Sequence, residues 1–462
     1  MQTQENKMGV QPVGRLLLSM SLPMMISMIV QALYNVVDSI FVSRLSEAAL
    51  TAVTLVFPVQ SLMIAFGSGL GVGINALLSK SLGQGDQKQA NQAARHGMVL
   101  FAAVCALFIG IGIFAARPFM AGQTDDAMIA ADGAAYLSIV CGCSFGLFGQ
   151  FLFERLLQST GRTFYTMVTQ SLGAVINIIL DPILIFGLFG APRMGVAGAA
   201  AATVFGQVCA ALLALYFNLR KNPELSLSMK RFKWEPRVLG VILSVGIPSV
   251  IMMSISSLMN LGMNVILISY SATAVAVFGV YFKLQSFVFM PVIGLNNGMV
   301  PILSYNYGAG KKDRMLSTIK LSISIAVPVM LLGTVVAQLF PEALFSLFDA
   351  SDAMLEIGVP ALKIISIHFP VAAVSIVLSS VFQALGNGIY SMVASFCRQL
   401  IALLPLAYLF ARIGGLDAVW WAFIPAEVIS LALCLYFFWR VDRKQLCRME
   451  DRGETNRTLR TA

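Results

Sequence analysis

The stretch GAVINIILDPILIFGLFG, residues 173–190, places Asn177, Asp181 and Pro182 in a run that is otherwise apolar. Its 18 residues approach the ~20 that a helix needs to cross the hydrocarbon core of a bilayer. An ionisable side chain at that depth costs about 2.5–3.5 kcal/mol. The stretch therefore predicts a membrane helix, and its carboxylate requires a specific reason.

The rest of the chain has the same apolar character. Of its 462 residues, 58% are hydrophobic and 11% are charged, and the mean hydropathy is +0.82, whereas soluble domains are about 25% charged. We therefore expect an all-α integral membrane protein with twelve transmembrane helices, near residues 15–43, 50–79, 94–116, 133–157, 163–190, 195–219, 238–270, 274–306, 321–347, 358–385, 391–413 and 418–439. The first run is too long for a signal peptide and lacks a small-residue cleavage site, so we expect it to be retained.

The distribution of basic residues predicts the orientation in the membrane. Short cytoplasmic loops are enriched in Lys and Arg, and alternate loops hold most of them, including Lys80, Lys88, the segment 220–237 and Lys311. We expect a multi-pass protein of the cell inner (plasma) membrane with both termini in the cytoplasm. These loops and the basic tail account for most of the net charge of +9, so we expect no nucleic-acid partner.

An internal repeat is visible at an offset of 225 residues. This offset relates "YTMV" (165–168) to "YSMV" (390–393), and it relates Ser19 to Ser244, Pro23 to Pro248, Asn35 to Asn260, Gly83 to Gly308 and Gln158 to Gln383. Six spans per half is an even number, so the halves are parallel repeats, an architecture of transporters. We expect two pseudo-symmetric six-helix bundles, with lobes at 1–219 and 238–440, a cytoplasmic linker at 220–237 and a basic cytoplasmic tail at 441–462.

Two polar stripes lie within the first lobe, and each ends in a carboxylate. At helical spacing, Gln31, Asn35 and Asp38 share one face of the first span, and Gln170, Asn177 and Asp181 share one face of the fifth. The repeat positions of Asp38, Asn177 and Asp181 hold Met263, Ala402 and Leu406. Because the second half lacks these polar groups, we interpret the pair of carboxylates as functional.

Structural roles compete with functional roles at several positions. Asp181 before Pro182 could cap a broken helix, and Glu154 could pair with Arg155 or extend to the membrane surface. His368 is more often a packed, hydrogen-bonded histidine than a proton relay. The remaining intramembrane ionisable residues, Lys283, Lys363, Arg398 and Glu427, keep both interpretations open.

The sequence favours an ion gradient as the energy source. "GSGLGVG" (67–73) lies in an apolar run without a preceding strand, and no GxxxxGK[ST] pattern occurs in the chain. A buried pair of carboxylates can take up a proton near neutral pH or bind a sodium ion instead. Seven cysteines lack paired zinc spacing, so we expect no structural metal and no disulfide. A transporter without a cofactor, and not an enzyme, is the expectation.

The motifs resemble those of the multidrug and toxic compound extrusion (MATE) family, in its DinF-like branch near the MepA-type exporters. The segments that carry the resemblance are QALYNVVDSIFVSRL (31–45), GINALLSKSLGQGD (73–86), FERLLQSTGRTFYTM (151–167) and INIILDPILIFG (176–187). The resemblance implies two six-helix bundles in a V that opens alternately to each side. It also implies exchange of H+ or Na+ for lipophilic, often cationic compounds.

The family's functional positions map onto this chain residue by residue. Asp38, Asn177 and Asp181 match its coupling-ion or substrate-binding residues, Thr203 matches a nearby hydroxyl, and Pro23 matches the proline at which the first helix is proposed to bend. Any sodium ion is expected at Asp38, Asn177 and Asp181. From Arg237 to Lys312 the chain has no Asp or Glu, which favours the first lobe for the coupling ion.

Two other functions are compatible with such a chain. A flippase for a lipid-linked precursor would need a strongly cationic cavity, and the set Lys283, Lys363 and Arg398 is small for that purpose. A passive channel is disfavoured by prolines that interrupt the first and fifth spans. Drugs and organic cations, with the surrounding membrane lipids, are the expected partners. The sequence does not indicate drug specificity or oligomeric state, and a monomer would suffice.

Overall fold

The computed structural model describes residues 6–348, 350–447 and 449, and no strand occurs among them. The first half contains α1 (Lys7–Val10), α2 (Val13–Ser43), α3 (Glu47–Gly83), α4 (Gln87–Gly110), the π-helical η1 (Ile111–Ala115), α5 (Ala116–Ala121), α6 (Ala127–Gly142), α7 (Phe145–Ser159), α8 (Thr163–Phe186) and α9 (Val196–Lys221). These helices confirm the six predicted spans of the first half.

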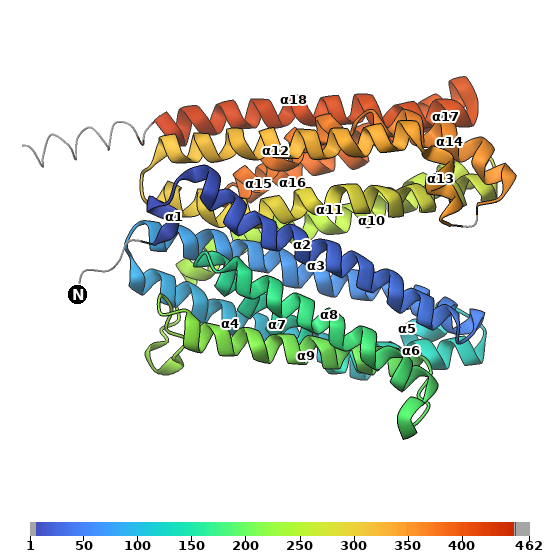
Figure 1. Cartoon of the computed structure of the whole chain (residues 1–462), viewed down its shortest axis with the longest axis horizontal. Coiled ribbons are helices and arrows are strands. Elements are labelled where there is room, and N and C mark those ends of the chain that lie inside the picture. Colours follow the sequence, from blue (N-terminus) through green and yellow to red (C-terminus); the bar gives the residue numbers. More distant parts are fainter. Residues whose placement is uncertain (1–5, 349, 448, 450–462) are drawn as a thin grey trace, which may run out of the picture. The chain divides into compact units, whose positions relative to one another are not determined.

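The second half repeats this order. It contains α10 (Pro236–Ile268), α11 (Ala272–Gly308), α12 (Lys312–Leu339), α13 (Pro341–Ser346), α14 (Asp352–Ser366), α15 (Phe369–Ala384), α16 (Gly388–Phe396), the π-helical η4 (Cys397–Leu403), α17 (Leu404–Val419), α18 (Phe423–Val441) and the π-helical η6 (Asp442–Leu446). In Figure 1 the long helices of this half run side by side.

The described helices account for twelve spans. Nine are long and apolar enough by themselves, and the bent pairs α6–α7 (42°) and α14–α15 (52°) raise the number to eleven. The longest of the nine, Gly388–Leu446, holds 59 residues, about twice the length that one crossing requires. Its backbone leaves the helical conformation at Gly415 (φ 70°, ψ −159°), and α18 packs back against α16 and η4. This run therefore contains two spans.

The chain forms two compact units. The N unit comprises Ile26–Leu82 and Asp86–Gly246, and the C unit comprises the residues up to Met25, Gly83–Gly85 and the chain from Ile247 onward. The units follow the two halves of the sequence except at the ends of the halves. The division falls inside α2 and inside α10, close to the repeat-related prolines Pro23 and Pro248.

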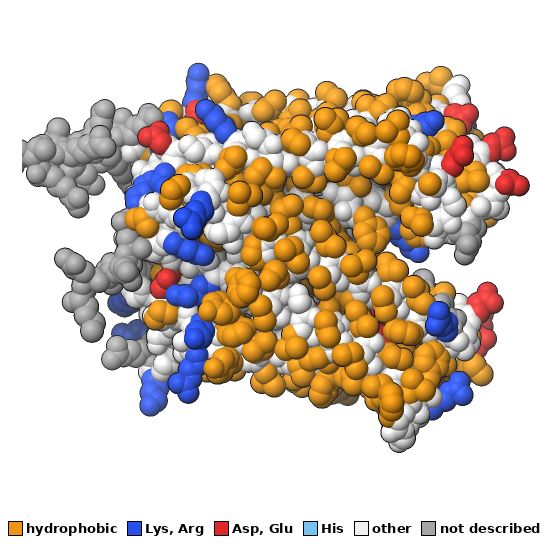
Figure 2. All heavy atoms as spheres, in the orientation of Figure 1, with side chains coloured by type: hydrophobic (Ala, Val, Ile, Leu, Met, Phe, Trp, Pro, Cys, Tyr) orange, Lys and Arg blue, Asp and Glu red, His pale blue; other side chains and the backbone are white. Residues whose placement is uncertain are grey.

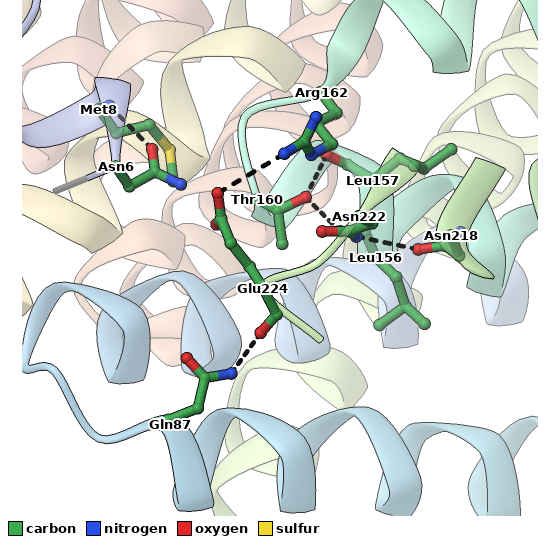
Figure 3. A network of polar contacts seen from close by, with 10 residues as sticks. All are labelled: Asn6, Met8, Gln87, Leu156, Leu157, Thr160, Arg162, Asn218, Asn222 and Glu224. Carbon is green, nitrogen blue, oxygen red and sulfur yellow. Dashed lines mark hydrogen bonds and ion pairs between the residues drawn. The ribbon is translucent and has the colours of Figure 1, made fainter. Parts of the chain in front are cut away.

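The segment expected to link the lobes is attached to the N unit. Arg162 Nη2 lies 3.9 Å from Glu224 Oε1, and Gln87 Nε2 donates to the Glu224 carbonyl oxygen (Figure 3). Further along, His96 Nε2 accepts from the Glu235 N–H at 3.0 Å. The segment 220–237 is therefore fastened to α4 and to the α7–α8 turn. Of the expected tail, Arg448 and residues 450–462 lie outside the described residues.

Helices α2 and α8 continue through their prolines. Pro23 lies inside Val13–Ser43, and Pro182 lies inside Thr163–Phe186. The prediction that proline interrupts the first and fifth spans is therefore wrong at the level of the helix, and Asp181 is not an N-cap. Each proline still removes one backbone hydrogen bond from the middle of its helix.

In each unit taken by itself, hydrophobic side chains cover the middle of the helices, and most of the visible Lys and Arg side chains gather at one end of them (Figure 2). In the N unit this is the end at which α3 turns into α4 (Figure 1). An apolar band with charged ends is the pattern expected of helices that cross a bilayer.

Candidate functional site

Close packing of α8 against α9 builds the polar site of the N unit. A Cβ added at Gly206 would lie 2.6 Å from the Gly173 carbonyl oxygen, and one added at Gly198 would lie 2.6 Å from the Leu184 carbonyl oxygen. Only glycine permits this approach of the two backbones. As a result, Asn177 of α8 and Thr203 of α9 come within hydrogen-bonding distance.

The Asn177 amide connects Thr203 to Asp181. Hydrogen bonding favours the amide orientation in which Nδ2 donates to Asp181 Oδ2 at 2.9 Å and Oδ1 accepts from Thr203 Oγ1 and N, both at 3.1 Å. Asp181 is fully buried, and Asn177 and Thr203 are 2% and 7% exposed. Because buried polar groups are stable only with partners, this triad is a specific arrangement.

Asp38 of α2 completes the site. Its carboxyl group lies near enough to that of Asp181 for the two to interact electrostatically, and Asp38 Oδ1 is buried with no hydrogen-bond partner among the described residues. Two carboxylates at this range repel each other and can share one proton. The structure thus brings together Asp38, Asn177, Asp181 and Thr203, as the sequence predicts.

Three further side chains, which the sequence analysis missed, lie close to the carboxyl pair. Tyr34 of α2 and Tyr136 of α6 are near enough for their hydroxyls to interact electrostatically with both Asp38 and Asp181. Gln60 of α3 donates to the Tyr136 hydroxyl at 3.0 Å. Tyr34 could have been found, because it lies one helical turn before Asp38. Tyr136 and Gln60 carry no comparable signal.

The remaining predicted residues of the first span lie farther from this cluster. Gln31 is half-buried on α2, and Asn35 is exposed, with its carbonyl oxygen accepting from Ser39 Oγ at 2.9 Å. Pro23 belongs to the part of α2 that packs in the C unit. No hydrogen bond joins the side chains of Gln31 or Asn35 to Asp38 or Asp181 in the described structure.

Glu154 of α7 occupies a second polar cluster of the N unit. It is 2% exposed and accepts from Gln150 Nε2 at 3.0 Å, Thr169 Oγ1 at 2.9 Å and Gln170 Nε2 at 2.7 Å. Among the described residues none forms an ion pair with it. The interpretations of Glu154 as a partner of Arg155 or as a group extended to the membrane surface are therefore wrong.

In the C unit, the intramembrane ionisable residues are dispersed or paired. Arg398 Nη1 lies 3.3 Å from Glu427 Oε2, and His368 Nδ1 lies 2.5 Å from the Ile365 carbonyl oxygen, with its ring against Phe423. Lys283 is exposed, with its ammonium 5.8 Å from the centre of the Phe348 ring, and Lys363 is exposed. His368 has the packed, hydrogen-bonded environment expected of a structural histidine.

The donor set of the N-unit site consists of two carboxylates, one amide and one hydroxyl. Such oxygens suit a proton or a hard monovalent cation, and none is a soft ligand of the kind that selects zinc or copper. A single charge that binds at the two carboxylates relieves their repulsion. The site can therefore hold and release one small cation within an apolar lobe.

Fold and site together define a multi-pass membrane transporter built from two parallel repeats. The sequence model of the MatE family matches residues 23–183 and again residues 248–409. The second match begins 225 residues after the first, which confirms the internal repeat. The chain belongs to the MatE family.

Proteins of known name and structure match nearly the whole chain. The FAD transporter of Shewanella oneidensis is 27% identical over 445 residues (93% of this chain, 95% of the relative), and the multidrug export protein MepA of Staphylococcus haemolyticus is 27% identical over 455 residues (95% and 97%). A multidrug resistance MATE family transporter in an outward-facing conformation superposes with a TM-score of 0.89 at 25% identity, covering 98% of this chain and 100% of that structure. A MATE crystal structure in complex with MaL6 gives 0.90 at 24%, with 97% and 100% coverage.

Proposed function

We propose that this protein is a secondary active multidrug efflux antiporter that exchanges H+ or Na+ for lipophilic, often cationic compounds by alternating access. The observation that carries the proposal is the pair of the half-buried Asp38 and the buried Asp181 in the N unit, with Asn177 and Thr203 holding Asp181 in place. The name of the MepA relative supports drugs as the substrate class.

The carboxyl pair couples the two fluxes in the following way. With both groups ionised, their repulsion favours uptake of a proton or a sodium ion, and release of that ion restores the charge. One charge that moves through 100 mV supplies about 2.3 kcal/mol. At about 1.4 kcal/mol per tenfold ratio, this energy sustains a drug gradient of roughly fifty-fold.

The charge distribution supports the orientation that we propose. Because Lys and Arg favour the cytoplasmic side, the basic end seen in Figure 2 faces the cytoplasm of the inner (plasma) membrane. Both termini are then cytoplasmic. The coupling ion enters from the opposite side while the drug leaves.

The proposal is tested by ethidium efflux from proteoliposomes, with the pH and Na+ gradients imposed separately. Wild type is compared with Asp38→Asn. The matched control is Asp125→Asn, which makes the same substitution in the exposed α5–α6 loop. We expect one gradient to drive efflux by wild type and Asp125→Asn but not by Asp38→Asn. Ethidium that moves under neither gradient, or an unchanged rate in Asp38→Asn, would contradict the proposal.

The flippase alternative receives less support from the structure. A lipid pyrophosphate requires several cations that converge on one place. In the C unit Lys283 and Lys363 are exposed, and Arg398 is paired with Glu427. A flavin dinucleotide is a better second candidate, because a relative of equal identity is named an FAD transporter. Efflux of FAD from the same proteoliposomes separates it from a drug substrate.

A further inference from the structure

Glu154 of α7 packs against the face of α8 that carries the coupling site. It lies nearer than that site to the N-terminal end of α8. Its partner Gln170 and the site residue Asn177 share one face of α8, seven residues or about 10 Å apart along the axis. Between them, Gly173 packs against Gly206 and Ala210 of α9, and Ala174 is buried. A second buried carboxyl therefore lies between the Asp38–Asp181 pair and the end of the unit that we assign to the cytoplasm.

The hydrogen bonds of Glu154 suit both protonation states. Thr169 Oγ1 lies 2.9 Å from Glu154 Oε1 and 2.9 Å from the Thr166 carbonyl oxygen, and one hydroxyl proton can serve only one of these acceptors. When Glu154 is ionised, Thr169 donates to it. When Glu154 carries a proton, it donates to Thr169 and Thr169 donates to Thr166, with no movement of heavy atoms.

A second acceptor is available in the same cluster. Gln170 Nε2 donates to Glu154 Oε2, whereas Gln170 Oε1 is buried without a partner in the described structure. Rotation of the amide would present this oxygen to a protonated carboxyl. A carboxylate with a purely structural role would need only the donors.

The charged surroundings of Glu154 are simple. Helices α3, α4, α8 and α9 pack against α7, and the one charged side chain that acts electrostatically on the Glu154 carboxyl in the described structure is Arg155. Arg155 donates to Gln158 Oε1 at 2.8 Å and to Ser68 Oγ at 3.2 Å. Since these partners are neutral, Arg155 keeps them whether or not Glu154 is ionised.

We propose that Glu154 is a second proton-binding carboxyl of the N unit and that it carries the coupling proton between the Asp38–Asp181 pair and the cytoplasmic end. This inference rests on the proposed function, with H+ as the coupling ion. In each step a carboxyl group gives its proton to water, and water gives a proton to the next carboxylate, so the net charge stays the same. The Thr169 hydroxyl reverses its hydrogen bond as Glu154 is loaded and emptied.

The first test is infrared difference spectroscopy of the reconstituted protein during a pH titration. It detects the C=O stretch of a protonated carboxyl and does not depend on transport. We expect a band that is lost in Glu154→Gln and retained in Asp181→Asn and in Glu356→Gln, which makes the same substitution at an exposed position of α14. A spectrum of Glu154→Gln identical to that of wild type would overturn the proposal.

The second test concerns transport. We expect drug-driven proton release in Glu154→Gln to be about tenfold slower or more and Glu154→Asp to recover part of the rate, while ethidium still binds. Wild-type rates in Glu154→Gln would contradict the relay even if the carboxyl titrates. A failure of wild type to couple ethidium to either gradient would instead count against the proposed function.

A third variant serves if Glu154→Gln does not fold. Gln150→Leu keeps the carboxyl but removes a donor that binds its ionised form more strongly than its protonated form. We expect the midpoint of the infrared band to move to higher pH by about one unit or more. An unchanged midpoint would show that the band does not belong to Glu154.

Discussion

Asn177 decides whether the buried charge of Asp181 is tolerable, because its amide is the neutral donor that reaches this carboxyl. Replacing Asn177 by Leu leaves Asp181 without that donor and Thr203 without its acceptor. A buried acceptor that loses its partner costs about 1–3 kcal/mol. The arrangement of the site therefore depends on one amide as much as on the two carboxylates.

With H+ as the coupling ion, we expect Asn177→Leu to lower the proton concentration for half-maximal ethidium efflux about tenfold, because the ionised form of Asp181 loses a donor. Thr203→Val removes one hydroxyl and keeps the side-chain volume, so a smaller shift is expected. The measurement is the efflux rate at a series of pH or Na+ values. An equal half-maximal concentration in wild type and Asn177→Leu would show that Asn177 does not hold the coupling ion.

At the same scale, the sequence predicts residues that share a helix face and misses those that meet across helices. Asp38, Asn177 and Asp181 could be found from spacing, and the missing repeat counterparts marked them as functional. Gln60 and Tyr136 are 76 residues apart, so no local pattern relates them. Glu154 lies beside Arg155 in the sequence but forms no ion pair with it in the described structure, because successive residues on a helix point about 100° apart and its carboxyl accepts from Thr169 and Gln170 of α8 instead.

At the scale of the element, glycines let α8 and α9 approach each other closely, and this contact positions the site. We expect Gly206→Ala to destabilise the protein by about 1–3 kcal/mol, because its Cβ would meet the Gly173 carbonyl oxygen at 2.6 Å and Asn177 Cβ at 3.5 Å. The matched control is Gly240→Ala on α10, where a Cβ has no neighbour within 4 Å. Thermal unfolding in detergent compares the two. An equal Tm would mean that α9 moves away from α8 without strain.

A second prediction at this scale concerns the linker segment, residues 220–237. The His96 imidazole accepts from the Glu235 N–H and packs against both Phe232 and Trp234, at 5.1 and 5.7 Å between ring centres. His96→Leu keeps an apolar side chain in this place but loses the acceptor. We expect faster hydrogen exchange at the amides of residues 232–235 and unchanged exchange in α8. Exchange that is equal to wild type would show that the aromatic contacts alone fasten the segment.

At the scale of the whole molecule, the sequence predicts the two-repeat architecture well, because a 225-residue offset and apolar runs of spanning length are global signals. The boundary of the units was harder to predict. The lobes expected at 1–219 and 238–440 follow the repeat, whereas the residues up to Met25 pack in the C unit and residues 220–246 pack in the N unit. Hydropathy reports which residues lie in the membrane and carries no information about which bundle they join.

The two points at which the chain passes from one unit to the other inside α2 and inside α10 have the same local construction. Ser19 Oγ donates to the Leu16 carbonyl oxygen at 2.8 Å, and its repeat counterpart Ser244 donates to the Val241 carbonyl oxygen at 2.8 Å. Pro23 and Pro248 follow these serines by four residues, so each proline leaves the serine carbonyl without its helical donor. A serine that bonds back to the preceding turn also favours bending. Both helices are thus weakened at the boundary of the units.

We therefore expect Pro23→Ala and Pro248→Ala each to slow ion-driven efflux, and the double variant to slow it further, without any loss of stability. Alanine restores the missing backbone hydrogen bond, so the Tm should stay equal or rise, whereas a helix that resists bending impedes alternation between the two states. Pro58→Ala, at a proline inside α3 away from the boundary, is the control. Efflux rates and Tm values measured on the same preparations separate the two effects. If the rates fell together with the Tm, or if Pro58→Ala slowed efflux equally, the boundary prolines would have no special part in alternation.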